Sequence, residues 1–191
     1  MNRSEIIDVF KDTGALLDGH FILTSGRHSS SYFQCARVLQ HPQYLTHFAE
    51  MIAEHFNKEK IDAVISPAIG GVVLGTEVGR IFKARTIFAE RKDGDMCIRR
   101  GFKIEPGENI LIVEDVITTG GSVREVMDQV INHKGTISGV GVMVDRSNGS
   151  IALHPNQFSI IAMEAKSYGP NEVPESLSAI PVQKPGSRKI V

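Results

Sequence analysis

The stretch of sequence that decides the fold is residues 110–122, which read ILIVEDVITTGGS. Its apolar opening is typical of a strand that is covered on both faces, as in a parallel sheet. Two adjacent carboxylates, Glu114 and Asp115, end the apolar run, and a glycine pair follows. Because glycines let the backbone turn tightly, this stretch predicts a strand, a turn and then a helix over residues 122–133.

The same alternation continues on both sides of this stretch. Apolar runs predict further strands over residues 61–66, 85–89, 137–144 and 158–162. Apolar residues at helical spacing predict helices over residues 4–10, 42–56 and 72–82, the first of them capped by Ser4. Repeated strand–turn–helix units predict an α/β fold with a mostly parallel central sheet flanked by helices.

Three segments carry no such pattern. Residues 91–109 are charged and contain glycine, which predicts a mobile loop or a hairpin. Residues 21–39 are rich in serine and are predicted to be irregular, as are most residues from 168 onward, where four of the eight prolines occur.

The composition excludes several classes of protein. The 191 residues predict a single domain, and 21 Lys and Arg against 22 Asp and Glu give a net charge of −1. That balance argues against a broadly basic surface, so we expect no nucleic-acid partner. No apolar run approaches the ~20 residues of a membrane helix, and no secretory signal opens the chain, so we expect no membrane partner. Cys35 and Cys97 stand far apart, as expected of reduced thiols in a cytoplasmic protein.

Residues 118–122 (TTGGS) describe a cradle for a phosphate monoester. Glycines bring backbone N–H groups close to an anion, and the helix N-terminus adds further donors and a partial positive charge. Thr118, Thr119 and Ser122 supply hydroxyl groups. The acids just before the cradle suit the hydroxyls of a ribose 5-phosphate, or a Mg²⁺ ion shared with the ligand.

The TTGGS segment differs from other known phosphate-binding loops. A Walker A loop needs a Lys after the glycines, and a dinucleotide-binding loop needs GxGxxG with its acid about 20 residues later. The remaining alternative is an ordinary strand–helix turn, with Ser122 as N-cap and the acids as a solvated strand end. In a parallel sheet, ligands bind beyond the carboxyl ends of the strands, which directs attention to residues 66–71, 114–122 and 145–149.

The block VEDVITTGGS (113–122) resembles that of the type I phosphoribosyltransferases. The similarity runs almost end to end, through GHFILTSGRHSSSYFQ (19–34), SPAIGG (66–71), AERKDG (89–94), VDRSNG (144–149) and IPVQKPGSR (180–188). The SGRxS segment and the Asp-Arg after the 137–144 strand narrow the resemblance to the orotate branch, in its short bacterial and archaeal form. The implied fold has a hood from residues 1–40 and the C-terminal segment, and a core over about 41–165, within one domain.

The resemblance implies a site for 5-phosphoribosyl 1-diphosphate (PRPP). The acid pair would hold the ribose hydroxyls, the cradle the 5-phosphate, and residues 66–71 the diphosphate, with a peptide bond that can be cis in relatives at Ala68–Ile69. The implied PRPP-binding residues are Ala68, Ile69, Gly70, Arg91, Lys92, Glu114, Asp115, Val116, Ile117, Thr118, Thr119, Gly120, Gly121 and Ser122. Arg91, Lys92 and Asp115 would be the catalytic residues.

The resemblance also implies an orotate site and a partner subunit. The orotate-binding positions would be Thr118, Arg146, Ser25, Gly26, Tyr32 and Phe33. For Arg146 the alternative is a surface arginine that pairs with Asp145. Residues 91–103 match a flexible catalytic loop that reaches into the neighbouring subunit's site, so the working unit would be a homodimer.

The chain departs from the family pattern at several positions. A loop Lys and a loop His of the best-known members correspond most nearly to Asp95 and Cys97, and two further lysines correspond to Gly70 and Thr24. Arg99, Arg100 or Lys103 could supply the missing charge. A CPxC pair that is common in relatives is replaced at Val173 and Ser176, which argues against a metal site there.

The implied reaction is transfer of the 5-phosphoribosyl group from PRPP to N1 of orotate, giving orotidine 5′-monophosphate and diphosphate in pyrimidine biosynthesis. Mg²⁺ is the implied cofactor, held mainly through PRPP and near the acid pair, with no direct protein site. Two alternatives stay open. One is transfer to another nucleobase, which the SGRHS segment and Arg146 disfavour. The other is a regulator that binds PRPP on the same fold, which the weakened basic loop favours and the near-zero net charge disfavours.

Overall fold

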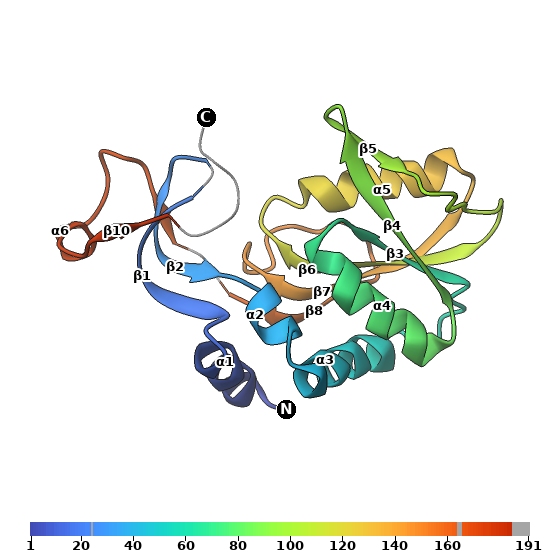
Figure 1. The fold of residues 1–191 in the computed structure, drawn as a ribbon, viewed down its shortest axis with the longest axis horizontal. Coiled ribbons are helices and arrows are strands. Elements are labelled where there is room, and N and C mark those ends of the chain that lie inside the picture. Colours follow the sequence, from blue (N-terminus) through green and yellow to red (C-terminus); the bar gives the residue numbers. More distant parts are fainter. Residues whose placement is uncertain (24, 164–165, 185–191) are drawn as a thin grey trace. The chain divides into compact units, whose positions relative to one another are not determined.

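The computed structural model of the chain describes residues 1–23, 25–163 and 166–184. Thr24 and residues 185–188 of the C-terminal motif therefore lie outside the described residues. The chain forms two compact units, one of residues 1–38 and 164–191 and one of residues 39–163 (Figure 1). No helix of the described part has the length and apolar character needed to cross a membrane.

The larger unit is built on a six-stranded sheet with the order β5-β4-β3-β6-β7-β8. Its strands are β3 (Ala63–Pro67), β4 (Arg85–Lys92), β5 (Asp95–Ile98), β6 (Asn109–Ile117), β7 (Thr136–Asp145) and β8 (Gln157–Ala162). Neighbouring strands are parallel except β4 and β5, which form an antiparallel hairpin. The prediction of a mostly parallel sheet in an α/β fold is therefore confirmed.

Helices cover both faces of this sheet. They are α3 (Pro42–His55), α4 (Gly70–Phe82) and α5 (Gly121–Asn132). On one face, Val123 and Val126 of α5 belong to the same core cluster as Ile65 and Ile112. The helices α3 and α4 lie on the opposite face (Figure 1). Both faces of β3 and β6 are thus covered, which is why these strands appear in the sequence as continuous apolar runs.

The smaller unit holds a four-stranded sheet with the order β10-β1-β2-β9. Its elements are α1 (Arg3–Asp12), β1 (Leu16–Ile22), β2 (His28–Phe33), β9 (Ser167–Tyr168), α6 (Glu175–Ser178) and β10 (Val182–Gln183). A short helix, α2 (Ala36–Leu39), spans the sequence boundary between the units. Because β10 pairs with β1 and β9 pairs with β2, the C-terminal segment folds onto the N-terminal hairpin.

The prediction that residues 21–39 are irregular is wrong. Residues 28–33 (HSSSYF) form β2, which pairs antiparallel with β1. The run is mostly polar, so it lacks the apolar alternation that marks a half-buried strand. Its pairing with β1, rather than its own composition, makes it a strand.

Two helix starts also differ from the sequence prediction. The N-cap of α1 is Asn2 rather than Ser4: the Asn2 side chain accepts from the Glu5 N–H group at 3.1 Å, and the Glu5 carboxylate accepts from the Asn2 N–H group at 2.8 Å. This is a capping box. The N-cap of α5 is Gly120, so Ser122 lies inside the first turn and does not cap the helix.

Candidate active site

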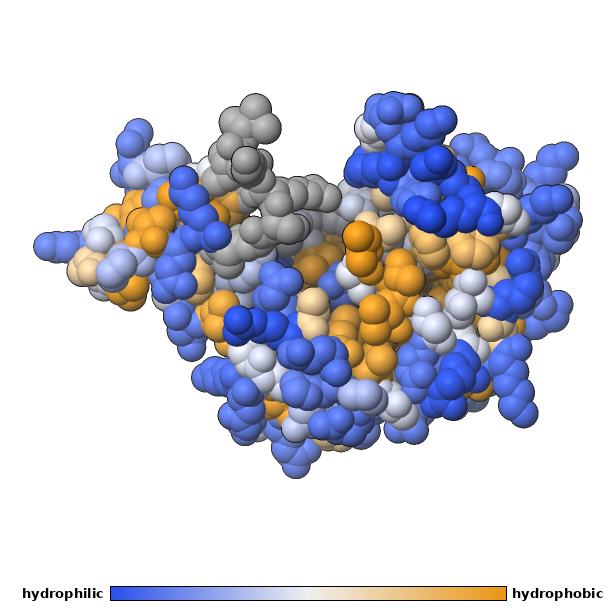
Figure 2. Space-filling view, viewed as in Figure 1, coloured by the Kyte–Doolittle hydropathy of each residue, from blue (hydrophilic) through white to orange (hydrophobic). Residues whose placement is uncertain are grey.

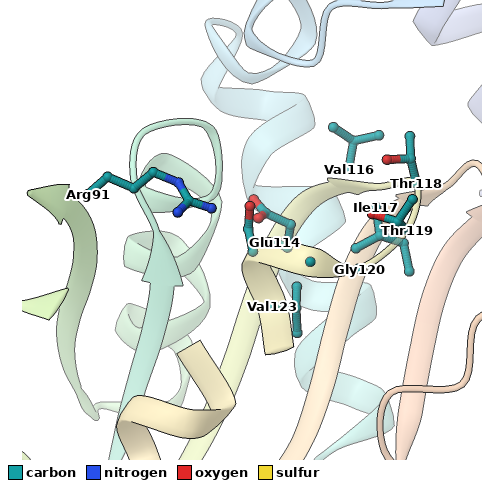
Figure 3. Close-up of a pocket in the computed structure, with 10 residues that line it drawn as sticks. Arg91, Glu114, Val116, Ile117, Thr118, Thr119, Gly120 and Val123 are labelled. Atoms are coloured by element: carbon teal, nitrogen blue, oxygen red, sulfur yellow. The ribbon is translucent and has the colours of Figure 1, made fainter. Parts of the chain in front are cut away.

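A pocket opens where β6 passes into α5 (Figure 3). It is lined by Arg91, Glu114, Val116, Ile117, Thr118, Thr119, Gly120, Gly121, Ser122 and Val123. All but Val123 belong to the predicted PRPP-binding set. The structure therefore brings the charged end of β4 close to Glu114 in β6 and to the cradle that follows this strand.

The cradle depends on the backbone conformation of Gly120. This residue has a φ of +73° and a ψ of +14°, in the left-handed region that favours glycine. A Cβ atom at this position would lie 2.7 Å from a methyl group of Leu153. The sharp turn aims the first N–H groups of α5, which have no acceptor within the helix, at the pocket. Behind the loop, Arg124 donates to the Thr119 carbonyl oxygen at 2.6 Å and closes it.

Glu114 is buried and Asp115 is half-buried, and the two acids are linked through the backbone. Glu114 is 7% exposed, and its Oε1 accepts from the Asp115 N–H group at 3.1 Å. Oδ1 of Asp115 accepts from the Val116 N–H group at 2.9 Å. Burial raises the pKa of Glu114 well above its usual value, and the charge of Asp115 adds to the rise. Burial also raises the pKa of Asp115, although its hydrogen bonds oppose the rise.

These pKa directions decide how the pair can be charged. Two carboxylates side by side in a poorly solvated place cannot both ionise at low cost. A bound ligand that supplies hydroxyl donors, or a cation, would relieve this repulsion. Glu114 is therefore not a solvated side chain, unlike the strand-end acids of the alternative to a ligand site.

The loop between β3 and α4 packs against this acid pair. The peptide bond between Ala68 and Ile69 is cis, and the Ala68 N–H group donates to the Ala89 carbonyl oxygen at 2.7 Å. The Asp115 carboxylate fills the space beside Gly70. Residues 68–70 are thus neighbours of the acids, although they do not line the pocket itself.

Arg91 reaches the pocket from the end of β4. Its Nη1 group donates to the Gly94 carbonyl oxygen at 2.7 Å, and Nη2 lies 2.6 Å from Oε2 of Glu125 on α5. Lys92 is exposed and stands opposite Asp95 in the hairpin. Figure 2 shows that the end of this hairpin is hydrophilic.

Arg99, Arg100 and Lys103 are the candidates to replace the positive charge of the loop lysine found in relatives. The structure gives the two arginines and the lysine different surroundings. Glu90 accepts two hydrogen bonds from Arg100, at 2.9 and 3.0 Å, and forms a 3.5 Å ion pair with Arg99. The hydrogen bonds from Arg100 hold the pKa of Glu90 below its usual value. The guanidinium of Arg100 also lies over the Phe88 ring, 5.7 Å from its centre. Both arginines are therefore engaged within the hairpin.

Lys103 lies at the other end of β4. Its carbonyl oxygen is 3.4 Å from the side chain of Arg85, the first residue of that strand, whereas Arg91 and Lys92 are the last two. A strand of this length separates its ends by roughly 20 Å, at ~3.3 Å per residue. In this arrangement Lys103 cannot face the pocket, and Arg91 with Lys92 remain the basic residues at the carboxyl end of β4.

Arg146 follows β7, and its backbone places it beside the cradle. The Arg146 N–H group donates to the Ile117 carbonyl oxygen at 2.9 Å, one residue before Thr118. The buried carboxylate of Asp145 instead accepts from the N–H groups of Ser147 and Gly149, at 2.8 and 3.0 Å. Asp145 therefore holds the turn together, and base binding by Arg146 stays a prediction.

The other predicted orotate-binding residues belong to the smaller unit. Ser25 is exposed, and Gly26 has a φ of +77° in the turn between β1 and β2. The Tyr32 ring lies 5.7 Å from that of Phe21, and the buried Phe33 ring lies edge-on to Phe10 at 6.0 Å. The Phe33 ring is thus part of the core of this unit and is not free to stack on a base. Base binding by these four residues stays a prediction.

Two acids at this end of the molecule were missed from the sequence. Glu90 holds Arg99 and Arg100, and Glu125 faces Arg91. Glu90 lies within the AERKDG segment, but its pairing with Arg99 and Arg100 is not visible there. No motif marks Glu125, and its pairing with Arg91 joins elements that are distant in the chain. Only the spacing of Glu125, four residues after Gly121, shows that it lies on the cradle side of α5.

Comparison with known proteins gives consistent results. Residues 34–154 match the phosphoribosyl transferase domain family. The chain is 56% identical over 188 residues to a protein of Chlorobium phaeobacteroides and 59% identical over 188 residues to one of Chlorobaculum parvum, both named orotate phosphoribosyltransferase. Each match covers 98% of this chain and 97% of the relative. A crystal structure of orotate phosphoribosyltransferase from Aeropyrum pernix is similar in fold, with a TM-score of 0.71 and 23% identity over 82% of this chain and 93% of that one.

Proposed function

The chain belongs to the orotate phosphoribosyltransferases, and from this membership we propose how its own residues carry out the reaction. The enzyme transfers the 5-phosphoribosyl group of PRPP to orotate, which gives orotidine 5′-monophosphate and diphosphate in pyrimidine biosynthesis. The observation that carries the assignment of roles is the single pocket that joins the TTGGS cradle, Glu114 and Arg91.

PRPP binds by its phosphate and its ribose. The 5-phosphate accepts hydrogen bonds from the N-terminal N–H groups of α5 and from the hydroxyls of Thr118, Thr119 and Ser122. The ribose 2′- and 3′-hydroxyls donate to Glu114 and Asp115. These donors relieve the repulsion between the two acids, whose pKa values burial raises in the free protein. Binding therefore lets both acids carry charge beside the sugar.

The transfer itself needs positioning and charge stabilisation more than proton chemistry. N1 of orotate forms a bond to C1 of the ribose while the bond from C1 to the diphosphate oxygen breaks, and the electron pair leaves with diphosphate. The transition state resembles an oxocarbenium ion, as in other substitutions at an anomeric carbon. Glu114 and Asp115 lie on the side where positive charge develops, while Arg91 and Lys92 oppose the charge of the leaving group. Thr118 and Arg146 bind the base, the latter through charge-assisted hydrogen bonds.

We also propose Mg²⁺ as the cofactor. Within the described residues no three His, Cys, Asp or Glu side chains gather as a metal site, and the adjacent carboxylates near the end of β6 are Glu114 and Asp115. This donor set fits Mg²⁺, which binds proteins through one or two carboxylates together with substrate phosphates and several waters. When bound, the ion would neutralise charge on the diphosphate. Glu114 and Asp115 would be the protein residues that help to hold it.

A homodimer with a shared loop is the proposed working unit. Ile69 and Val73 at the start of α4 are 83% and 45% exposed, an unusual pair of apolar side chains for open solvent. Figure 2 shows apolar surface over this part of the larger unit. Coverage of this surface by a second copy would bury it, and the neighbouring hairpin of β4 and β5 would then lie at the interface. We place the enzyme in the cytoplasm, in agreement with its two free cysteines.

Diphosphate release tests the proposal most directly. We expect the protein to release diphosphate from PRPP with orotate and Mg²⁺, and not with adenine, guanine or uracil. Arg146→Ala should lower kcat/KM for orotate by about ten- to a hundredfold, the effect of a lost charged hydrogen bond, while the fold survives. Release that needs another base, or an Arg146→Ala variant as active as the wild type, would overturn this assignment.

A further inference from the structure

We propose that Glu125 is the resting counter-ion of Arg91, and that an oxygen of the diphosphate group displaces it when PRPP or diphosphate binds. This inference rests on the proposed function, because it assumes that Arg91 binds the leaving group. It makes Glu125 a positioning residue, since Glu125 would act on the ligand only through Arg91.

The contact between the two side chains is short but poorly directed. Nη2 of Arg91 lies 2.6 Å from Oε2 of Glu125, yet this oxygen has no hydrogen-bond partner among the described residues. A distance of 2.6 Å is short enough for a hydrogen bond, so the angle must be unsuitable for one. The N–H bonds of Arg91 therefore do not point at this oxygen. The attraction is therefore mainly between charges. A phosphate oxygen that accepts an aligned N–H bond would be a better partner.

The position of the pair favours such an exchange. Arg91 lines the pocket, whereas Glu125 lies one turn farther along α5 and does not. Both side chains are half-exposed, 44% for Arg91 and 40% for Glu125, although Oε2 of Glu125 is itself buried at the contact. A ligand therefore reaches the pair from the side of Arg91, which lines the pocket. The second anchor of Arg91 is its bond to the Gly94 carbonyl oxygen in the hairpin turn. Both partners of Arg91 thus belong to residues that do not line the pocket.

The charge of Glu125 has a defined consequence for affinity. Without ligand, the carboxylate neutralises Arg91 and keeps its guanidinium beside the cradle. When diphosphate binds, this ion pair must break, which weakens the binding. A half-exposed ion pair contributes little free energy, so breaking it should raise the Kd for diphosphate about two- to fivefold.

Binding of inorganic diphosphate measured by calorimetry tests this exchange in four proteins. These are the wild type, Glu125→Gln, Arg91→Ala and the double variant. We expect Glu125→Gln to bind diphosphate about two- to fivefold more tightly than the wild type. In the Arg91→Ala background the same change should have no effect, because the group that the carboxylate neutralises is gone. The gain should also shrink in high salt, which screens half-exposed charges.

Asp128→Asn is the matched control. It removes an equal charge from the exposed side of the same helix, where Asp128 has no ion pair among the described residues. We expect its diphosphate affinity to equal that of the wild type. The proposal fails if Glu125→Gln binds more weakly or equally, or if its gain persists without Arg91. Failure of the function itself would look different, because the wild type would then not release diphosphate from PRPP with orotate.

Discussion

The carboxylate of Asp115 occupies the space that a side chain on Gly70 would need. Gly70 begins α4 at the carboxyl end of β3, and Asp115 lies near the end of the adjacent strand β6. Without a Cβ atom, Gly70 lets the acid approach the backbone of the loop that carries the cis bond. The loop and the acid pair therefore act as one structural unit.

Gly70→Ala should impair the reaction through Asp115. A methyl group at this position would collide with the carboxylate, which would rotate away from its hydrogen bond with the Val116 N–H group. We expect kcat/KM for PRPP to fall about ten- to a hundredfold, as for loss of a charged hydrogen bond, with little change in Tm. Steady-state kinetics in the Asp115→Asn background provide the check. If Gly70→Ala lowers kcat/KM for PRPP by the same factor in the Asp115→Asn background, its effect does not depend on Asp115.

Glu114→Gln should change how stability depends on pH. Burial and the neighbouring Asp115 raise the pKa of Glu114 in the folded protein above its ordinary value of 4.5. The folded state thus holds a proton that the unfolded state releases, so wild-type stability falls as pH rises from about 4.5 toward the raised pKa. A Gln has no charge to bury and keeps an oxygen for the Asp115 N–H group.

Thermal unfolding between pH 4 and 8 measures this difference. The two proteins should have similar Tm values at the acidic end, and the Gln variant should be the more stable near neutral pH. Asp115 titrates in both proteins, but its charge interacts with that of Glu114, so the comparison reports Glu114 together with its effect on Asp115. Parallel Tm curves over the whole range would show that Glu114 has the same proton affinity in both states.

The sequence predicts the centre of the fold well because local signals agree there. The apolar run before Glu114 and the glycines after it mark β6 and the start of α5 to within a few residues. Residue composition does not predict a strand that depends on pairing with another segment. The strand β2 is mostly polar and forms because it pairs with β1. The first cap was missed although a signal was present, since Asn2 is followed by Glu5 at capping-box spacing.

The site shows the same division between local and distant information. The cradle residues are contiguous, so their pattern alone indicates a phosphate site. The partners of the hairpin arginines could not be found in this way, because Glu90 and Glu125 become neighbours of these arginines only through strand pairing and helix packing. The position of Lys103 depends on the register of the hairpin, which no residue pattern in this segment fixes.

Gly120→Ala should weaken both the fold and phosphate binding. The residue adopts a φ of +73°, and a Cβ atom would meet Leu153 and Ile151. We expect a loss of about 1–3 kcal/mol in the free energy of unfolding, from backbone strain together with the collision. Phosphate affinity should fall as the N–H groups of the cradle shift. Denaturant unfolding and phosphate titration measure the two effects.

Gly107→Ala is the control for this substitution. Gly107 has a φ of +85°, and a Cβ atom there would meet nothing within 4 Å. It should therefore cost only the backbone strain, about 1–2 kcal/mol, and leave phosphate affinity unchanged. If both variants lose the same free energy of unfolding, Leu153 and Ile151 can move aside to accept the new methyl group without an energetic penalty. Unchanged phosphate affinity in Gly120→Ala would mean that the cradle does not depend on this turn.

Mixing two inactive variants tests the proposed sharing of the loop between subunits. Lys92→Ala removes an exposed loop cation that does not line the pocket of its own chain, and Asp115→Asn removes a ribose acid, so each protein alone should have little activity. If Lys92 acts in the partner's site, a mixed dimer contains one site with both residues intact. We expect partial recovery of orotidine 5′-monophosphate formation after the two proteins are unfolded and refolded together. If mixed dimers form, as tagged subunits would reveal, and no activity returns, Lys92 serves the site of its own chain.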